Sequence, residues 1–290
     1  MTIHLQFDWA PRIRSRTVAG SMGYAAHCRR LFPSLELDTS DLYLLEWFQI
    51  AGLPERVPGR ELAQVLHAHP KLAAFLISRH PPAAAYVDQL LTEHEPADAE
   101  ELLAAETAVV WEIAEWIVYQ REPQMYDALS VHEWDIVAAT ADVVALGGKV
   151  VLDAGAGSGH AALKAASHAA TVFAMEPVTT LRRYLRDKAA RLGIENLLVV
   201  DGFLDAIPLP QDSLDVIFTC RAIGWRLQHE MREIDRVVKP DGFAIHFTGL
   251  PYPADPDDPL HTALLADGYR EATYQEGVTT QRKYWKRCDA

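Results

Sequence analysis

Apolar residues in the second half of the chain form short runs that alternate with stretches of helical periodicity. In 179–192 and 227–238 the apolar residues recur at helical spacing, and 269–274 and 278–286 flank a Glu-Gly step that predicts an antiparallel hairpin. Strands that alternate with helices predict an α/β fold with a doubly wound, mostly parallel sheet, here of seven strands with the hairpin last. The runs that predict the buried strands are 150–152, 171–175, 197–200, 214–219 and 243–247.

The first part of the chain has a different pattern. Residues 40–121 read as helices with breaks at prolines, and the stretch 98–120 is apolar on most of its sides. Such a helix either runs through the centre of its domain or presents one face to another subunit. At Glu122-Pro123 a proline stops the preceding helix. We therefore expect a helical N-terminal domain over 1–121, which closes over an active site or dimerises, and the sheet domain over 122–290.

A glycine-rich turn follows the first predicted strand. Gly155, Gly157 and Gly159 stand at alternate positions, where the absence of a Cβ lets the backbone turn tightly and approach a bound ligand. Ligands of open α/β sheets bind at the carboxyl ends of the strands. A nucleotide-like ligand is therefore expected beside the acidic residues that end the first three strands, which are Asp153, Glu176 and Asp201.

Composition narrows the class of protein. The 290 residues are 49% hydrophobic, which predicts a globular chain, and 40 acidic against 27 basic residues give a formal net charge of -13. This balance disfavours a nucleic-acid partner. Cys28, Cys220 and Cys288 are far apart and form no CxxC pair, which argues against a disulfide scaffold or a zinc site. With no signal-like or membrane-spanning segment, we expect a cytoplasmic protein.

Several pieces of the second half together resemble the class I S-adenosylmethionine-dependent methyltransferases, over about Tyr126 to Arg287. In the glycine turn the third glycine falls one residue early for a dinucleotide motif. The resemblance implies S-adenosyl-L-methionine as cofactor and methyl transfer to a small-molecule acceptor, at O or N rather than C. A binding protein that kept the fold without catalysis is the alternative. The matching pieces are VVLDAGAGSG, AMEP, the Asp201-Gly202 step, LDVIFTC, DRVVKPDGF and the final hairpin.

A second resemblance concerns the helical part. The piece GRELAQVLHAHPKLAAFLISRH is similar to the small helical domain that precedes the catalytic domain in dimeric O-methyltransferases. That similarity implies a lid or a homodimer interface. Its His67 and His69 are two residues apart and point to different sides of a helix, so we expect no metal there.

The methyltransferase resemblance assigns residues to the cofactor. Glu176 lies 19 residues after Gly157 (176 − 157 = 19) and can accept hydrogen bonds from both ribose hydroxyls. The resemblance also implies that Asp201 meets the adenine amino group, with Phe203 or Leu204 against the ring, and that Asp153 faces the methionine end. The expected cofactor-binding residues are Asp153, Ala154, Gly155, Ala156, Gly157, Gly159, Glu176, Pro177, Asp201, Gly202, Phe203 and Cys220.

The acceptor side is less defined. After the fourth strand the chain reads TCRA, not the Asn/Asp-Pro-Pro-Tyr/Phe turn of nucleic-acid and amide N-methyltransferases, and Ala222 or Ile223 stands where dimeric O-methyltransferases place a histidine base. Other groups that could activate an acceptor are His132, His160 and His246, with Tyr126 to orient it. His246 lies inside a strand, where a core role is equally compatible. Residues expected to line a site for an aromatic or anionic substrate are Trp134, Arg221 and Trp225.

Overall fold

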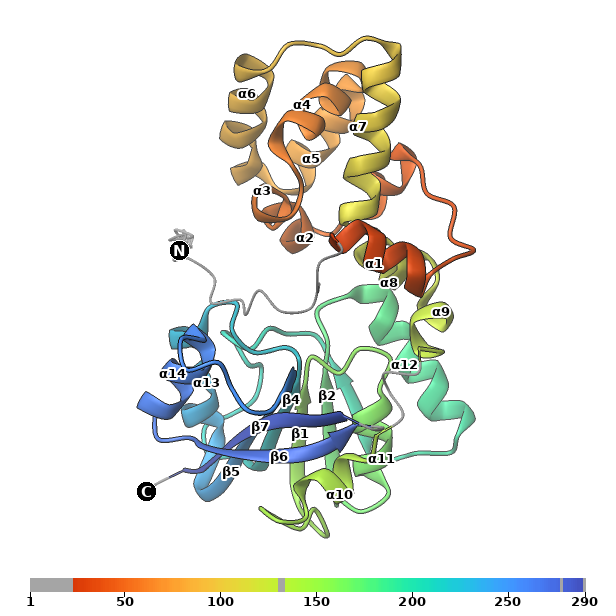
Figure 1. Cartoon of the computed structure of the whole chain (residues 1–290). Helices are drawn as coiled ribbons and strands as arrows, with labels where there is room; N and C mark the ends of the chain where they lie inside the picture. The colour runs from red at the N-terminus through yellow and green to blue at the C-terminus, as the bar shows by residue number, and fades with distance from the viewer. Residues whose placement is uncertain (1–22, 130–133, 277–278, 289–290) are drawn as a thin grey trace, which may run out of the picture. The chain divides into compact units, whose positions relative to one another are not determined.

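The computed structural model describes residues 23–129, 134–276 and 279–288, and its internal contacts divide the chain after Leu129. We call residues 23–129 the helical unit and the described residues from 134 onward the sheet unit. The elements of the helical unit are α1 (Tyr24–Leu31), η1 (Thr39–Leu44), α2 (Trp47–Ala51), α3 (Leu53–Arg56), α4 (Gly59–Ala68), α5 (Pro70–Arg79), η2 (Pro81–Ala83), α6 (Ala84–Glu93), α7 (Ala99–Glu112), α8 (Ala114–Arg121) and α9 (Pro123–Asp127) (Figure 1).

Prolines and one aspartate explain where several of these helices begin. Pro70, Pro81 and Pro123 each occupy the first position of a helix, where no backbone N–H is needed for the helical ladder. Asp98 caps α7 by accepting hydrogen bonds from the backbone N–H groups of Glu100 and Glu101, both at 3.0 Å. Local chemistry of this kind is visible in the sequence.

The apolar stretch 98–120 forms two helices rather than one, since α7 ends before Ile113 and α8 begins after it. Ile113 leaves the helical conformation with φ -117° and ψ 15°. The residues around this break lie in the core of the helical unit itself, which supports the expectation that the stretch runs through the centre of its domain. The buried residues there are Val109, Val110, Trp111, Ile113, Ala114, Trp116, Ile117 and Val118.

The division of the chain falls eight residues after the expected boundary at Arg121 (129 − 121 = 8). Pro123 ends one helix but at once begins α9, and Met125, Tyr126 and Leu129 pack against the core of the helical unit. A proline marks the end of an element, whereas the division between domains depends on which core the next residues join. The expected boundary is therefore too early.

The sheet unit has the predicted α/β fold. Its seven strands follow the order β3-β2-β1-β4-β5-β7-β6, with β1 to β5 paired in parallel and β7 antiparallel to both β5 and β6. The doubly wound sheet with a terminal hairpin is thus confirmed. The strands are β1 (Val150–Ala154), β2 (Thr171–Met175), β3 (Leu197–Val200), β4 (Leu214–Cys220), β5 (Val238–Pro251), β6 (Arg270–Glu276) and β7 (Thr279–Arg287).

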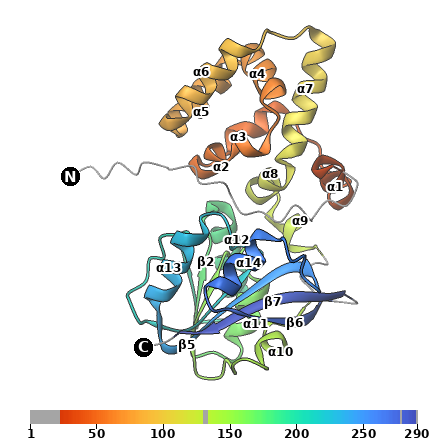
Figure 2. The same cartoon turned by 60° about the vertical axis from the view of Figure 1, so that its left-hand side comes forward.

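Helices cover both faces of this sheet, and a buried core lies on each side (Figures 1 and 2). Val151 and Val216 face the first core, and their neighbours Leu152 and Ile217 face the second. The first core includes residues of α10 (Ile136–Thr140), α11 (His160–Ala166) and α12 (Thr179–Arg191). The second includes residues of α13 (Leu227–Val237) and α14 (Pro259–Ala266).

The fifth strand is longer than predicted. β5 begins at Val238, and the partner of β4 shifts from Val238 to Phe243 across Asp215, so Lys239 to Gly242 form an irregularity inside the strand. The Lys-Pro-Asp-Gly step lies between the predicted helix over 227–238 and the predicted strand over 243–247. It does follow α13, but as part of the strand.

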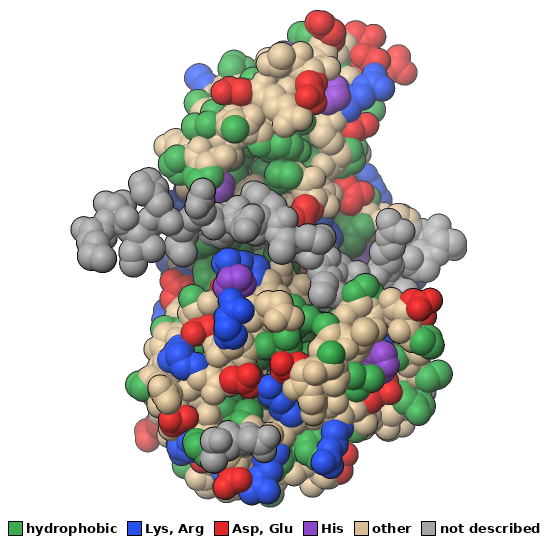
Figure 3. All heavy atoms as spheres, turned by 90° about the vertical axis from the view of Figure 1, so that its left-hand side faces the viewer, with side chains coloured by type: hydrophobic (Ala, Val, Ile, Leu, Met, Phe, Trp, Pro, Cys, Tyr) green, Lys and Arg blue, Asp and Glu red, His purple; other side chains and the backbone are tan. Residues whose placement is uncertain are grey.

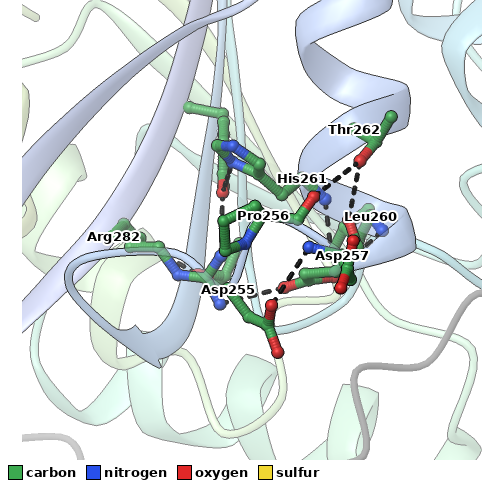
Figure 4. Close-up of polar contacts among 10 residues, drawn as sticks. Asp255, Pro256, Asp257, Leu260, His261, Thr262 and Arg282 are labelled. Carbon is green, nitrogen blue, oxygen red and sulfur yellow. Dashed lines mark hydrogen bonds and ion pairs between the residues drawn. The ribbon is translucent and has the colours of Figure 1, made fainter.

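The loop between β5 and α14 is anchored by polar contacts (Figure 4). Asp258 caps α14 by accepting from the backbone N–H of Leu260 at 3.0 Å, and its other carboxylate oxygen accepts from Nη2 of Arg282 at 3.0 Å. Both side chains of this ion pair are buried. Thr262 donates back to the carbonyl of Pro256 at 3.4 Å. The proline-rich loop is therefore attached to β7, which lies far from it in the sequence.

Helix apolarity and surface charge are two further properties of the described residues. Among the described residues, no helix combines the length and apolarity that crossing a membrane requires. Figure 3 shows basic and acidic side chains interspersed on the described part of one face.

Candidate cofactor and acceptor site

The glycine turn connects β1 to α11 through left-handed backbone conformations. Gly155, Gly157 and Gly159 have φ values of 84°, 55° and 90°, which side chains with a Cβ rarely adopt. The backbone N–H groups of Gly155 and Ala156 both donate to the carbonyl of Met175, at 2.8 and 2.9 Å. The turn is thereby bound to the end of β2.

The space saved at two of these glycines is taken by the protein itself. A Cβ on Gly155 would lie 2.5 Å from Cβ of Ala222, and one on Gly159 would lie 2.1 Å from Cδ1 of Leu185. Both distances are shorter than any tolerable contact. The expectation that these glycines make room for a ligand is therefore incomplete, because they first make room for the loop after β4 and for α12.

Glu176, at the end of β2, is bound to the glycine turn. One carboxylate oxygen accepts from the backbone N–H of Gly157 at 2.8 Å, and the other accepts from that of Val178 at 2.9 Å. The residue is only 5% exposed. These two backbone donors hold the carboxylate in one orientation beside the glycine turn. The ribose role expected for Glu176 is compatible with this geometry.

Arg182 on α12 links the ends of β2 and β3, and the sequence reasoning missed it. Its Nη1 donates to the carbonyls of Glu176 and Pro177 at 2.8 and 2.6 Å, and to Oδ1 of Asp201 at 2.8 Å. The Asp201 side chain is otherwise 66% exposed. An arginine in the first turn of the helix that follows an acidic strand end is the local signal that could have suggested this role.

Asp153 is the most unusual carboxylate of the site. It is 1% exposed, and neither carboxylate oxygen has a partner in hydrogen-bond geometry. Burial raises its pKa to about 8; the backbone of Ala162 acts to lower the pKa and the charge of Glu176 to raise it. Native proteins rarely leave a buried polar group without a partner. An orphaned carboxyl group beside a glycine turn therefore indicates a place for a cationic or hydrogen-bonding ligand.

The remaining residues expected to bind the cofactor lie along the same carboxyl edge. Ala154 ends β1 and is buried, and Pro177 follows Glu176. A Cβ on Gly202 would lie 2.8 Å from Sδ of Met175, so this glycine too is required by packing. Phe203 forms a bridge with Ala206 in the loop after β3. Cys220 ends β4; burial and the charge of Asp153 raise its thiol pKa well above the ordinary value.

Of the residues expected to line an acceptor site, Trp134 packs in the core of the sheet unit, whereas Arg221 and Trp225 lie after the end of β4. Trp134 packs within the sheet unit against Phe247 and Tyr274, with ring centroids 5.0 and 5.1 Å apart, so its location agrees with ordinary core packing. Trp225 lies in the loop after β4 and is 37% exposed. Arg221 directly follows β4 and pairs with Glu276 at the end of β6.

Glu230 shapes the loop that carries Trp225 and was also missed by the sequence reasoning. Its carboxylate accepts hydrogen bonds from the backbone N–H groups of Gly224, Trp225 and Arg226, at 2.7, 3.0 and 2.9 Å. Burial raises its pKa, although these three donors oppose the shift. A buried carboxylate with this many backbone donors holds a loop in one conformation.

Residues 151–242 match a family model described as a methyltransferase domain. The match covers about a third of the chain and confirms the predicted methyltransferase family for these residues. The cofactor of the predicted family is S-adenosyl-L-methionine. The glycine turn, Glu176 and the ends of β1 to β4 all lie inside the matched residues.

Curated relatives agree with this family but match only part of their own length. The uncharacterised methyltransferase YcgJ of Bacillus subtilis is 33% identical over 32% of this chain and 37% of its own length. A malonyl-[acyl-carrier protein] O-methyltransferase of Methylococcus capsulatus is 36% identical over 32% of this chain and 34% of its own. The chain therefore spans about a third of these relatives. Among solved structures, a SAM-dependent methyltransferase from Aquifex aeolicus is 20% identical, with a TM-score of 0.49 over 58% of this chain and 97% of that one.

The structure describes three of the four residues that were expected to act on an acceptor, namely Tyr126, His160 and His246. Tyr126 belongs to the helical unit, where its ring lies 4.7 Å from that of Tyr119, because α9 packs on the helical core. His160 is the first residue of α11, directly after the glycine turn. His132 lies outside the described residues. The role of Tyr126 as an orienting group stays a prediction.

His246 is a core residue rather than a base. It is fully buried in β5, with Nδ1 2.9 Å from Oγ1 of Thr219 and Nε2 3.0 Å from the hydroxyl of Tyr269. Burial, followed by the charge of Lys286, lowers its pKa to about 3. Both ring nitrogens have partners, and the imidazole is neutral at ordinary pH. Of the two readings of His246, the structure supports the core one.

Proposed function

We propose that this chain is an enzyme that transfers a methyl group from S-adenosylmethionine to a small-molecule acceptor, at oxygen or nitrogen. The observation that carries the proposal is the glycine turn bound to Glu176 beside the orphaned carboxyl group of Asp153, inside a domain of the methyltransferase family. These three features support the binding of this cofactor.

The residues of the site fit the cofactor group by group. Glu176 supplies a carboxylate beside the glycine turn for the ribose hydroxyls, and the exposed carboxylate of Asp201 lies two residues before Phe203. Asp153 supplies a buried acid for the ammonium group of the methionine end. When bound, S-adenosylmethionine supplies an electrophilic methyl group, and the chain holds the acceptor in line with it.

Orientation is the expected source of catalysis. One of the candidate bases, His246, is buried with both ring nitrogens bonded. Positioning two reactants contributes as much as about 7 to 11 kcal/mol to the lowering of a barrier. Methyl transfer to an acceptor that is already nucleophilic, such as a carboxylate, therefore needs no general base.

Oxygen is the acceptor that we favour. Two of the curated relatives are named malonyl-[acyl-carrier protein] O-methyltransferase, at 36% and 29% identity over part of their length. The name of a partial relative identifies no substrate of this chain. It does favour a carboxylate oxygen over carbon as the first class of acceptor to test.

The proposal includes a cytoplasmic location, a homodimer through the N-terminal helices, and no nucleic-acid partner. Support for the location comes from the cysteines, which are all free thiols, and two of them, Cys28 and Cys288, are buried. The net charge of -13 argues against binding to a phosphate backbone.

Calorimetry on the full chain with S-adenosylmethionine, S-adenosylhomocysteine and NAD tests the cofactor. We expect binding of the first two and none of NAD, and the reverse would contradict the proposal. S-adenosylhomocysteine production is then measured across a panel of carboxylic acids, phenols and amines. Binding without turnover on any acceptor would favour the alternative, a non-catalytic protein on a methyltransferase fold.

A further inference from the structure

Arg221 has a backbone conformation that is unusual for its residue type. Its φ is 61°, in the left-handed region, and the other non-glycine residues with positive φ among those described are Asp212 and Asp241. Aspartate tolerates this region because its short side chain bonds locally, whereas arginine has no such advantage. The N–H of Arg221 donates to the carbonyl of Phe247 at 2.8 Å, so β5 holds the residue in this conformation.

Two further residues place the Arg221 side chain. A Cβ on Gly249, which has φ 66°, would lie 2.0 Å from Nε of Arg221, so only glycine lets the side chain pass over β5. Nη2 then donates to both carboxylate oxygens of Glu276 at the end of β6, at 2.6 and 2.7 Å. The guanidinium is thus held by residues of β4, β5 and β6.

Stability alone does not explain this arrangement. The Arg221 side chain is 42% exposed, and ion pairs exposed to this degree contribute little to folding. A non-glycine residue with positive φ costs more than such a pair returns. Strained residues of this kind concentrate at functional sites, where the surrounding structure maintains them.

Part of the guanidinium remains available. Both hydrogen bonds to Glu276 come from Nη2, and Nη1 has no hydrogen-bond partner among the described residues. A guanidinium carries five N–H donors in a planar fork, which suits the two oxygens of a carboxylate. The exposed side of Arg221 can therefore bind a second carboxylate while Glu276 keeps the group in place.

Arg221 also lies next to the cofactor side of the domain. Ala222, its neighbour, packs so closely on the glycine turn that a Cβ on Gly155 would collide with it. The thiol of Cys220 is influenced by the charges of Asp153, Arg221 and Glu276. The ends of β1, β4 and β6 thus meet in one neighbourhood, beside the residues proposed to face the methionine end.

We propose that Arg221 binds the carboxylate of an anionic acceptor, with Gly249 and Glu276 as positioning residues for its guanidinium. The inference rests on the proposed methyl transfer, since it names the substrate class of the same site. A neutral acceptor of the same shape is bound more weakly, because it cannot form charge-assisted hydrogen bonds with Arg221.

The test uses the full chain and four small probes: malonate and acetate, and their neutral amides malonamide and acetamide. Binding is titrated by saturation-transfer NMR, with and without saturating S-adenosylhomocysteine. We expect malonate to bind at least about tenfold more tightly than malonamide, and Arg221→Gln to abolish that preference. Arg287→Gln is the matched control, because Arg287 pairs with Asp241 at the opposite end of the same sheet and is 60% exposed.

The outcomes separate this inference from the proposed function. S-adenosylhomocysteine affinity is measured first on each variant; equal affinity in wild type and Arg221→Gln shows that the fold is intact. Equal binding of malonate and malonamide, no binding of either, or an anion preference that survives Arg221→Gln overturns the role of Arg221. Absence of S-adenosylhomocysteine binding counts against the methyltransferase proposal, and the titrations without it still decide the anion preference.

Discussion

The two sides of the sheet hold their carboxyl-edge loops in different ways. On the cofactor side, Glu176 binds the backbone of Gly157, 19 residues away in the sequence. On the acceptor side, Arg221 binds the side chain of Glu276, 55 residues away. The first contact joins two neighbouring elements of one βαβ unit, and the second joins the fourth strand to the terminal hairpin.

The kind of bond differs as well as its span. Cofactor-side contacts end mainly on backbone groups, as when Arg182 donates to the carbonyls of Glu176 and Pro177. On the acceptor side Glu230 also binds backbone groups, but side-chain pairs such as that of Asp258 and Arg282 attach the terminal hairpin. Because backbone N–H and C=O groups are present whatever the sequence, a single suitable side chain is enough to form a hydrogen bond with them. Side-chain pairs require two particular residues, so a single substitution at either position breaks the contact.

Breaking the ion pair under the loop after β5 is expected to have the largest effect. Arg282→Leu leaves Asp258 buried without its cation, and removing one partner of a buried pair costs about 3 to 5 kcal/mol. Urea unfolding of the full chain measures the change in the free energy of unfolding. Arg287→Leu removes an exposed arginine from the same strand and should stay within about 0.5 kcal/mol. Equal losses in the two variants would contradict the role of the buried pair.

A matched pair of glycine substitutions tests the cofactor side. Gly159 and Gly193 both have positive φ, but a Cβ on Gly159 would meet Leu185, whereas nothing lies within 4 Å of one on Gly193. Gly193→Ala should cost about 1 kcal/mol through the backbone alone. Gly159→Ala should cost about 1 to 3 kcal/mol more, because it also overpacks the core. Thermal unfolding of both variants provides the comparison, and equal destabilisation would show that α12 adapts.

Removing the carboxylate of Glu176 should reduce cofactor affinity. Hydrogen bonds to a charged group contribute about 1.5 to 3 kcal/mol, so Glu176→Ala should weaken S-adenosylhomocysteine binding by about 10- to 150-fold. Isothermal titration calorimetry gives the affinities. Glu195→Ala, on the exposed surface just before β3, is the control and should bind as wild type does. Full affinity in Glu176→Ala would contradict the ribose assignment.

The smallest expected effect is the release of a proton by Asp153 when S-adenosylhomocysteine binds. In the folded protein the pKa of Asp153 is about 8, above the ordinary value, so the carboxyl group is mostly protonated at pH 7. Because the unfolded chain loses this proton at a lower pH than the folded protein does, folding becomes less favourable as pH rises from about 4 to 8. An ammonium partner favours the ionised form. Binding of S-adenosylhomocysteine at pH 7 should therefore release up to about one proton. The release should fade above pH 9.

Calorimetry in buffers of different ionisation enthalpy measures this proton. Asp153→Asn should bind S-adenosylhomocysteine without proton release. Identical proton release by wild type and Asp153→Asn would show that the proton comes from another group, and Asp153 would then have no role at the methionine end.

Most of the fold could be predicted, but with informative errors. Strand and helix order followed from apolar periodicity, since 214–219 and 171–175 each coincide with a strand to within one residue. The helix expected over 98–120 failed at Ile113, because a helix apolar on most sides carries no mark of where tertiary packing breaks it. The domain boundary failed because a proline reports on one helix and not on the core that the next helix joins.

Some residues of the candidate site could likewise be predicted from the sequence, and others could not. Glu176 and the glycine turn were found because their spacing follows from the length of a βαβ unit. Arg182 and Glu230 were missed, since a charged residue on a helix has no pattern that distinguishes a solvated position from one that holds a loop. The sequence allowed His246 to be either a catalytic base or a core residue, and only its hydrogen-bond partners in the structure distinguish the two roles.

By itself, the sequence determined the α/β fold, the methyltransferase family and the location of the cofactor turn, because local periodicity and short motifs encode what neighbouring elements do. Tertiary structure alone decided which side chains would collide with a Cβ at the glycines. A Cβ on Gly155 would collide with Ala222, and one on Gly249 would collide with Arg221. Tertiary structure also decided the pairing of Arg221 with Glu276 across 55 residues. Contacts of that span depend on how strands are ordered in the sheet, and that order brings together residues whose spacing along the chain carries no signal.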